Sequence, residues 1–203
     1  EAKQLGIKAG IPYYQLKQQF PNTEIAVFSS NYELYGEITG RVMSIIRKMS
    51  PQSFRYSIDE AFAILDGFSL DQLTSWGQEL HDRVLQSVGM PLSIGIAPTK
   101  TLAKMASHFA KKYPGYNHCC IIDNDQRRTK AETLYPIDEV WGIGRRYASR
   151  MTAMGIKTAY DFACHSESWV RSTFKNIDIE RTWQELNGTD CIPDEVSTKK
   201  QSI

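Results

Sequence analysis

The first part of the chain, up to about residue 122, alternates between helical and strand-like patterns of apolar residues. Apolar positions that recur every three or four residues mark one face of a helix, whereas short unbroken apolar runs are typical of buried strands. The helical spacing predicts helices over residues 13–20, 31–49, 70–88 and 99–112. The apolar runs predict strands over residues 24–28, 61–65, 92–97 and 119–122.

Residues 123–130 are a polar segment that we interpret as a domain boundary, and the pattern beyond it is all-helical. Short helices are expected over residues 136–140, 145–153, 158–164, 167–174 and 179–186. Mixed helices and strands followed by helices alone indicate an α+β layer joined to an all-α region. We therefore expect an antiparallel or mixed sheet with helices on one face, and a helical region after it.

Two adjacent acids, Asp59 and Glu60, lie between strand-like residues 54–56 and the apolar run that begins at Ala61. This pattern predicts a β-hairpin with both acids at or beside its turn. Adjacent side chains point to opposite faces of a strand, but at a turn the backbone bends and two carboxylates can converge on one ion. Hard cations such as Mg²⁺ are held by one or two carboxylates together with phosphate oxygens and water. The alternative is that both acids are only solvated, because Asp favours turns.

Basic residues recur on one face of the helix expected over residues 99–112. Steps of four and three residues separate Lys100, Lys104, His108 and Lys111, and this helix contains no acid. No pair within the helix therefore neutralises the stripe, which favours a site for phosphates. The alternative is an ordinary solvated helix face.

Two glycines one residue apart, Gly142 and Gly144, precede an expected helix that begins at Arg145. Glycines at a helix N-terminus let backbone N–H groups approach a phosphate without interference from side chains, and the helix dipole favours the anion. Arg145, Arg146 and Arg150 would add salt-sensitive phosphate contacts. The alternative is a tight glycine turn inside a helical bundle.

Composition narrows the class of protein only slightly. With 41% hydrophobic and 23% charged residues, the chain has the composition of an ordinary globular protein. The net charge of +1 predicts no partner, so contacts with nucleic acid would depend on local patches. The four cysteines show no CxxC spacing, which favours free thiols in a reduced cytoplasm. No apolar run approaches the roughly 20 residues that span a bilayer, so we expect no membrane partner.

Three stretches, taken together and in order, carry a specific resemblance. Residues 28–35 (FSSNYELY), 57–62 (SIDEAF) and 92–104 (LSIGIAPTKTLAK) resemble the Y-family, or translesion, DNA polymerases, and within them the catalytic subunits of bacterial SOS polymerases. The resemblance covers essentially the whole chain. It implies that residues 1–30 are a remnant of the fingers domain and 31–124 the palm. Residues 125–189 would be a thumb with a helix-hairpin-helix motif, and 190–203 a linker toward a little finger domain.

The resemblance also implies a reaction and its residues. The family adds deoxynucleotides to primer-template DNA from deoxynucleoside triphosphates, aided by two Mg²⁺ ions that align the reacting oxygens. Asp59 and Glu60 would be two of the three metal-binding carboxylates. Lys3 and Lys111 match positions that contact the nucleotide triphosphate. The thumb motif, with Gly142, Gly144, Arg145 and Arg146, would bind the DNA backbone.

Other features of the family fall outside this sequence. Its third carboxylate and its steric-gate aromatic come from a strand that would precede Glu1, and its little finger would follow Ile203. We therefore expect a fragment that is inactive alone, taken from a polymerase of the bacterial cytoplasm and nucleoid. Accessory SOS subunits and a sliding clamp are the further partners implied.

Three other functions are compatible with parts of the pattern. A non-enzymatic helix-hairpin-helix module would bind DNA without metal, so replacing Asp59 would leave its activity unchanged. A palm-fold nucleotide cyclase also carries acids on a hairpin, but it has no need for the glycine motif. A purely structural subunit would be favoured if the complete protein failed to bind magnesium.

Overall fold

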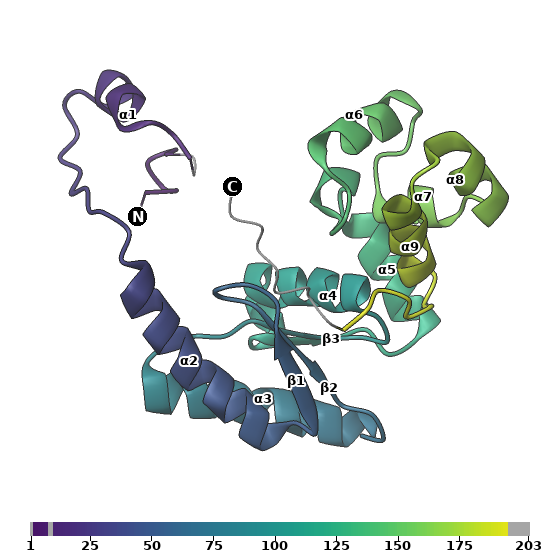
Figure 1. Ribbon diagram of the computed structural model, residues 1–203, viewed down its shortest axis with the longest axis horizontal. Helices are drawn as coiled ribbons and strands as arrows, with labels where there is room; N and C mark the ends of the chain where they lie inside the picture. The colour runs from purple at the N-terminus through teal and green to yellow at the C-terminus, as the bar shows by residue number, and fades with distance from the viewer. Residues whose placement is uncertain (1, 8–9, 195–203) are drawn as a thin grey trace. The chain divides into compact units, whose positions relative to one another are not determined.

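The computed structural model describes residues 2–7 and 10–194 (Figure 1). The chain forms two compact units, Glu1–Glu33 and Leu34–Ile203, and the boundary between them falls in the first turn of α2 (Tyr32–Met49). The linker expected over residues 190–203 lies mostly outside the described residues.

The N-terminal unit contains one helix, α1 (Tyr13–Gln19), among the residues that the structure describes. Pro12 precedes it in an extended conformation, with φ −61°. The prediction of a strand over residues 24–28 is wrong, because this segment is extended but belongs to no ladder in the described chain. Phe28 is 86% exposed. An apolar run favours a strand only where a second strand supplies hydrogen bonds, and no such strand pairs with it here.

The second unit begins with helix α2, the predicted β-hairpin and a further helix. Strands β1 (Gln52–Arg55) and β2 (Ala61–Ile64) pair antiparallel, with Phe54 opposite Phe62. Their rings stack with centroids 5.5 Å apart. Helix α3 (Leu70–Val88) has the predicted bounds. A capping box between Ser69 and Gln72 begins it, and Gly89 ends it with φ 73°.

A crossover unit follows, made of β3 (Ile94–Ile96), α4 (Lys100–Lys112) and β4 (Cys119–Ile121). A short 3₁₀ turn (Pro114–Tyr116) connects α4 to β4, and β3 and β4 pair in parallel. The Thr99 hydroxyl caps α4 by accepting a hydrogen bond from the Leu102 N–H. Gly95 lies directly against the helix, because a Cβ there would overlap the backbone of Ala103 and Ser107. The absence of a side chain at Gly95 therefore sets the close packing of α4 on β3.

The prediction of one sheet is only partly right. In the part of the chain that the structure describes, the strands form two separate two-stranded ladders. They are joined by apolar packing: Ala61 and Ala63 of the hairpin meet the cluster that contains Ile94, together with Leu80 and Val84 of α3. Hydrophobic contact does not need the edge-to-edge alignment that hydrogen bonding requires, so a shared core can form without a continuous sheet.

The all-helical region is present as predicted. Its elements are α5 (Asp125–Leu134), a 3₁₀ turn (Ile137–Glu139), α6 (Arg145–Ala153), α7 (Ala159–Ala163), α8 (Glu167–Phe174) and α9 (Ile177–Leu186). The first of the predicted helices is thus a single 3₁₀ turn, and the polar segment at 123–130 forms most of α5. The main hydrophobic cluster includes Leu102 and Phe109 of α4 as well as Phe162 and Leu186. Helix α4 therefore lies between the strands and the helical region (Figure 1).

Candidate metal and nucleotide site

The tip of the β1–β2 hairpin places Asp59 and Glu60 in a tight loop. Beyond the last strand pair, the N–H groups of Tyr56 and Ser57 both donate to the Glu60 carbonyl, at 3.0 and 3.1 Å. Arg55 fixes the loop from one side, since its guanidinium donates to the carbonyls of Ser57 and Ile58, both at 2.9 Å. Both acidic side chains are exposed. The loop is therefore rigid while its carboxylates remain accessible.

Ser57 lies between the two carboxylates. Its Oγ is 2.9 Å from Asp59 Oδ1 and 3.4 Å from Glu60 Oε2. The two carboxylates therefore converge across a single hydroxyl group, as the turn predicted. Sequence reasoning did not give Ser57 a role, although a hydroxyl residue two positions before an Asp is a common turn signal.

Lys104 of α4 contacts this tip. Its Nζ is 2.7 Å from Glu60 Oε1, and it lies 4.7 Å from the centroid of the Tyr56 ring and 5.5 Å from that of Trp141. Trp141 in turn donates its indole N–H to the Tyr56 hydroxyl at 3.0 Å. One acid of the pair is thus already charge-compensated by a residue from the basic stripe.

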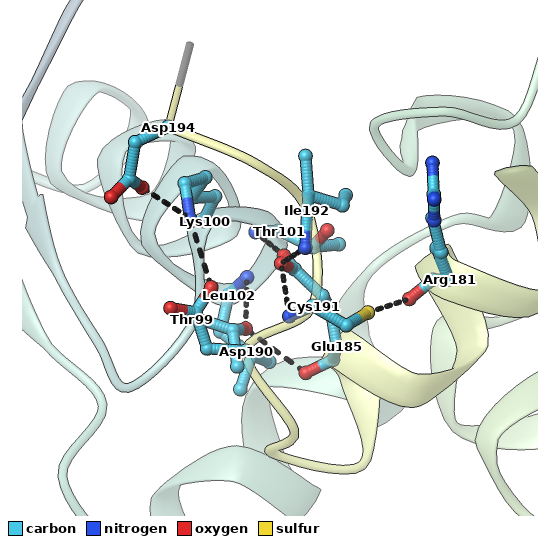
Figure 2. Close-up of polar contacts among 10 residues, drawn as sticks. All are labelled: Thr99, Lys100, Thr101, Leu102, Arg181, Glu185, Asp190, Cys191, Ile192 and Asp194. Atoms are coloured by element: carbon cyan, nitrogen blue, oxygen red, sulfur yellow. Dashed lines mark hydrogen bonds and ion pairs between the residues drawn. The ribbon is translucent and has the colours of Figure 1, made fainter. Parts of the chain in front are cut away.

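Two further members of the stripe, Lys100 and His108, also have acidic partners, which come from distant parts of the chain. Lys100 Nζ lies 2.9 Å from a carboxylate oxygen of both Asp190 and Asp194 (Figure 2). Burial by itself lowers the pKa of Lys100, but the hydrogen bonds from these two acids outweigh it and the pKa is raised. His108 Nδ1 lies 3.2 Å from Glu139. The helix itself contains no acid, as expected, but acids from other parts of the chain neutralise most of the stripe.

Lys111 is the exception on this face. It is exposed and has no carboxylate partner within the described residues. It follows Lys104 by seven residues, which is close to two helical turns, so both side chains lie on one face and about 10 Å apart along the axis. Lys111 therefore lies on the side of α4 that Glu60 contacts. Lys3, the second lysine proposed for phosphates, belongs to the N-terminal unit and lies there in an exposed turn.

The N-terminus of α4 is fixed to the helical region by a buried acid, Glu185 of α9 (Figure 2). Its Oε2 accepts a hydrogen bond from the Thr101 N–H at 2.7 Å, and its Oε1 accepts one from the Ile192 N–H at 3.1 Å. The Thr99 hydroxyl donates to the Glu185 carbonyl at 2.9 Å. No local sequence signal marks Glu185, because an acid on a short amphipathic helix resembles a surface residue.

The two glycines before α6 have different roles in the structure. Gly142 has φ +89°, and a Cβ there would overlap the Thr182 hydroxyl. Gly144 has an ordinary φ of −74°, and a Cβ there would meet no described atom within 4 Å. Gly144 is also the N-cap of α6, which has no side-chain cap in the described chain. The fold thus requires glycine at 142, whereas Gly144 leaves the helix N-terminus open.

The three arginines of α6 also differ in their contacts. Arg145 and Arg146 are exposed and form no ion pair with any residue that the structure describes. Arg150 instead donates to the Thr173 carbonyl at 2.8 Å and lies over the Phe174 ring. The guanidinium of Arg146 lies over the Tyr147 ring, 5.7 Å from its centroid, but it remains exposed. Arg145 and Arg146 can therefore both meet a ligand, while Arg150 is fixed by a hydrogen bond to the backbone.

The donor set at the hairpin tip fits a hard divalent ion that has further ligands. Among residues 2–7 and 10–194, no group of three or more His, Cys, Asp or Glu side chains is placed to hold a metal. Two carboxylates are nevertheless sufficient where phosphate oxygens and water complete the coordination. No helix in these ranges is long and apolar enough to cross a membrane.

Comparison with known proteins places the chain in a family. The model of the impB/mucB/samB family matches residues 1–108, which is more than half of the chain. The chain therefore belongs to the impB/mucB/samB family.

Curated relatives match along the whole chain. Protein UmuC of Salmonella typhimurium is 41% identical over all of this chain and 49% of its own length. Protein MucB of Escherichia coli is 35% identical over 100% of this chain and 48% of its own length. A protein named DNA polymerase IV 1, from Halalkalibacterium halodurans, is 30% identical over 95% of this chain and 45% of its own. The chain thus spans about half the length of the relatives it matches.

Solved structures share the fold. An insertion ternary complex of Dbh DNA polymerase matches 94% of this chain and 55% of its own, with a TM-score of 0.73 and 23% identity. The crystal structure of DinB from Sulfolobus solfataricus matches 91% of this chain and 54% of its own, with a TM-score of 0.71 and 24% identity. The chain therefore shares the arrangement of strands and helices found in these two structures.

Proposed function

We propose that this chain forms the catalytic part of a template-directed translesion DNA polymerase, which adds deoxynucleotides to primer-template DNA. The observation that carries the proposal is the convergence of Asp59 and Glu60 across Ser57 at an accessible hairpin tip. Relatives named as DNA polymerases support it. The resemblance to bacterial SOS polymerases extends the proposal to accessory SOS subunits and a sliding clamp as partners, in the bacterial cytoplasm and nucleoid.

Asp59 and Glu60 would hold Mg²⁺, with two ions in the complete site. When bound, these ions align the primer 3′ hydroxyl with the α-phosphate and neutralise the developing charge. The contribution of the chain is to present the two carboxylates on a loop that Arg55 and Ser57 keep rigid. A displacement of about 1 Å at such a site can reduce the rate on the order of a hundredfold, so this rigidity matters for turnover.

Lys111 would bind the triphosphate of the incoming nucleotide. Its exposure and its lack of a carboxylate partner among the described residues leave its full charge available. Lys104 on the same helix face contacts Glu60, so Lys111 extends this face toward the β- and γ-phosphates of a metal-bound nucleotide. The resemblance to the family assigns the same kind of phosphate contact to Lys3.

The turn at Gly142–Gly144 would bind the DNA backbone as part of a helix-hairpin-helix motif in the thumb. The uncapped N-terminus of α6 presents N–H groups and a favourable dipole to a phosphate. Arg145 and Arg146 add positive charge beside it. Such contacts are independent of base sequence, which suits an enzyme that copies any template. By this assignment residues 1–30 belong to the fingers, 31–124 to the palm and 125–189 to the thumb.

Primer extension by the full-length protein that contains this chain tests the proposal. We expect Asp59→Asn and Glu60→Gln each to abolish Mg²⁺-dependent extension while leaving the melting temperature unchanged, because both side chains are exposed. Asp66→Asn is the matched control, since Asp66 is an exposed acid just beyond β2. Extension within a few-fold of wild type for both acid variants would show that Asp59 and Glu60 do not hold the catalytic metal. DNA binding by the wild-type protein without any extension would instead favour a DNA-binding module without catalysis.

A further inference from the structure

Lys104 is more enclosed than an ordinary surface lysine. Its side chain is 21% exposed, compared with 47% for the Glu60 side chain that it contacts. Its Nζ lies near the faces of two aromatic rings, those of Tyr56 and Trp141. Cation–π attraction and a charge-assisted hydrogen bond therefore act on the same ammonium group.

The rings that enclose Lys104 are themselves fixed. Trp141 and Tyr56 meet edge to face with centroids 5.4 Å apart, and Phe62 packs 5.8 Å from Trp141. The Thr182 hydroxyl donates to the Trp141 carbonyl at 3.4 Å. Trp141 directly precedes Gly142, so the glycine turn of the helical region and the hairpin tip are connected through this aromatic cluster.

The contact uses only one oxygen of Glu60. Lys104 binds Oε1, whereas Oε2 lies on the side of Ser57 and Asp59. Holding Oε1 therefore orients the carboxylate so that Oε2 faces the other acid. The ammonium charge also acts against metal binding, because a cation beside the site repels a divalent ion.

We propose that Lys104 is a positioning residue that orients Glu60 for the metal and lowers the affinity of the acid pair for it, with Trp141 holding Lys104 in place. This inference rests on the proposed function of the acid pair. It assigns a role in metal loading to a lysine whose ammonium group contacts one of the two acids. Because Trp141 directly precedes Gly142, the position of the turn at Gly142–Gly144 also affects the geometry at the metal site.

Two measurements on the full-length protein separate the two effects. Mn²⁺ binding, followed by electron paramagnetic resonance without DNA or nucleotide, reports the affinity of the acids. Single-turnover primer extension at saturating Mg²⁺ reports the orientation of Glu60. For Lys104→Met we expect Mn²⁺ to bind about tenfold more tightly, because a repulsive charge is removed. We expect the extension rate to fall at least about tenfold, because the carboxylate loses its orientation.

Further variants keep the test decisive. Lys104→Arg preserves the charge, so its Mn²⁺ affinity should match wild type and its extension rate should lie between those of wild type and Lys104→Met. Trp141→Leu should lower the extension rate in the same direction as Lys104→Met. Lys112→Met is the control, because Lys112 is exposed on the same helix and its charge lies over the Tyr113 ring instead. Melting temperatures identify any variant that is simply unfolded.

Different results would overturn the inference about Lys104 and the proposed function. If folded Lys104→Met extends primers as fast as wild type, then Lys104 does not position Glu60. If it binds Mn²⁺ no more tightly than wild type, then the ammonium charge of Lys104 does not lower the affinity of the acid pair. If extension nevertheless stays dependent on Asp59, the proposed function survives and only the role of Lys104 is lost. If Asp59→Asn has no effect on extension, the proposed function itself fails.

Discussion

Glu185 on α9 accepts a hydrogen bond from the backbone N–H of Thr101, 2.7 Å away in the first turn of α4. The acid is fully buried and also accepts bonds from the N–H groups of Cys191 and Ile192. A single carboxylate therefore joins three segments: the helix that carries Lys104 and Lys111, the last helix, and the chain that leaves it. Its position at the N-terminus of α4 adds a favourable interaction with the helix dipole.

Removing this acid should destabilise the fold substantially. Glu185→Ala removes the acceptor of the buried Thr101 N–H and of the partly buried N–H groups of Cys191 and Ile192. A buried N–H without an acceptor costs on the order of 1–3 kcal/mol and a partly buried one less, so we expect a total of about 2 kcal/mol or more. Glu185→Gln keeps one acceptor oxygen and should lose less. Urea unfolding measures both, with Glu79→Ala as the exposed control, for which we expect less than about 0.5 kcal/mol. Equal stability of Glu185→Ala and wild type would show that the carboxylate is dispensable.

Lys111 should affect nucleotide binding without affecting stability. In the full-length protein, Lys111→Ala removes a cation from the triphosphate, so the KM for the incoming nucleotide should rise by about tenfold. Steady-state insertion of single nucleotides checks this value. Lys112→Ala is the neighbouring control, since Lys112 lies at a different angle around α4. A KM for Lys111→Ala equal to that of Lys112→Ala would exclude the phosphate contact.

The two glycines of the turn should respond differently to a side chain. Gly142→Ala places a Cβ at φ +89° and against Thr182, so it should destabilise the fold by at least about 1–2 kcal/mol. Gly144→Val should fold, because the space around Gly144 is open in the described structure. In the full-length protein it should weaken DNA binding equally for different duplex sequences, since phosphate contacts carry no base information. Fluorescence anisotropy at one fixed salt concentration, on several sequences, tests this; unchanged affinity would make the turn purely structural.

Glu132 should make stability depend on pH. Burial raises the pKa of this carboxyl from 4.5 to about 7, while the nearby Arg128 acts in the opposite direction. A raised pKa in the folded state means that protonation favours folding. The stabilisation of the fold by protonated Glu132 is complete below about pH 4.5, declines as the pH rises, and is lost above about pH 7.

Glu132→Gln mimics the protonated acid and should remove this dependence. Relative to wild type, the variant should gain about 2 kcal/mol at about pH 8 and little at about pH 5. Chemical unfolding at the two pH values provides the measurement. Parallel pH profiles for the variant and wild type would contradict the assignment of Glu132 as the titrating group.

Local patterns predicted the elements well and the contacts between them poorly. Helical spacing predicted the bounds of α3, and the strand-like runs beside Asp59 and Glu60 placed these acids at a hairpin turn, because both features depend on neighbouring residues. The partners of the basic stripe could not be found in this way. Glu60 lies 44 residues from Lys104, and Asp190 lies 90 residues from Lys100. The incorrect strand at residues 24–28 has the same cause, because a strand exists only through a partner that the local sequence does not specify.

The dispersed partners of α4 also have an evolutionary consequence. Lys100, Lys104 and His108 face acids that come from three separate parts of the chain. A change of charge at one member of such a pair leaves the other uncompensated in a partly enclosed place, so related proteins are expected to change both members together. Lys111 has no such partner in the described chain, so its conservation would reflect selection by a ligand and not by the fold.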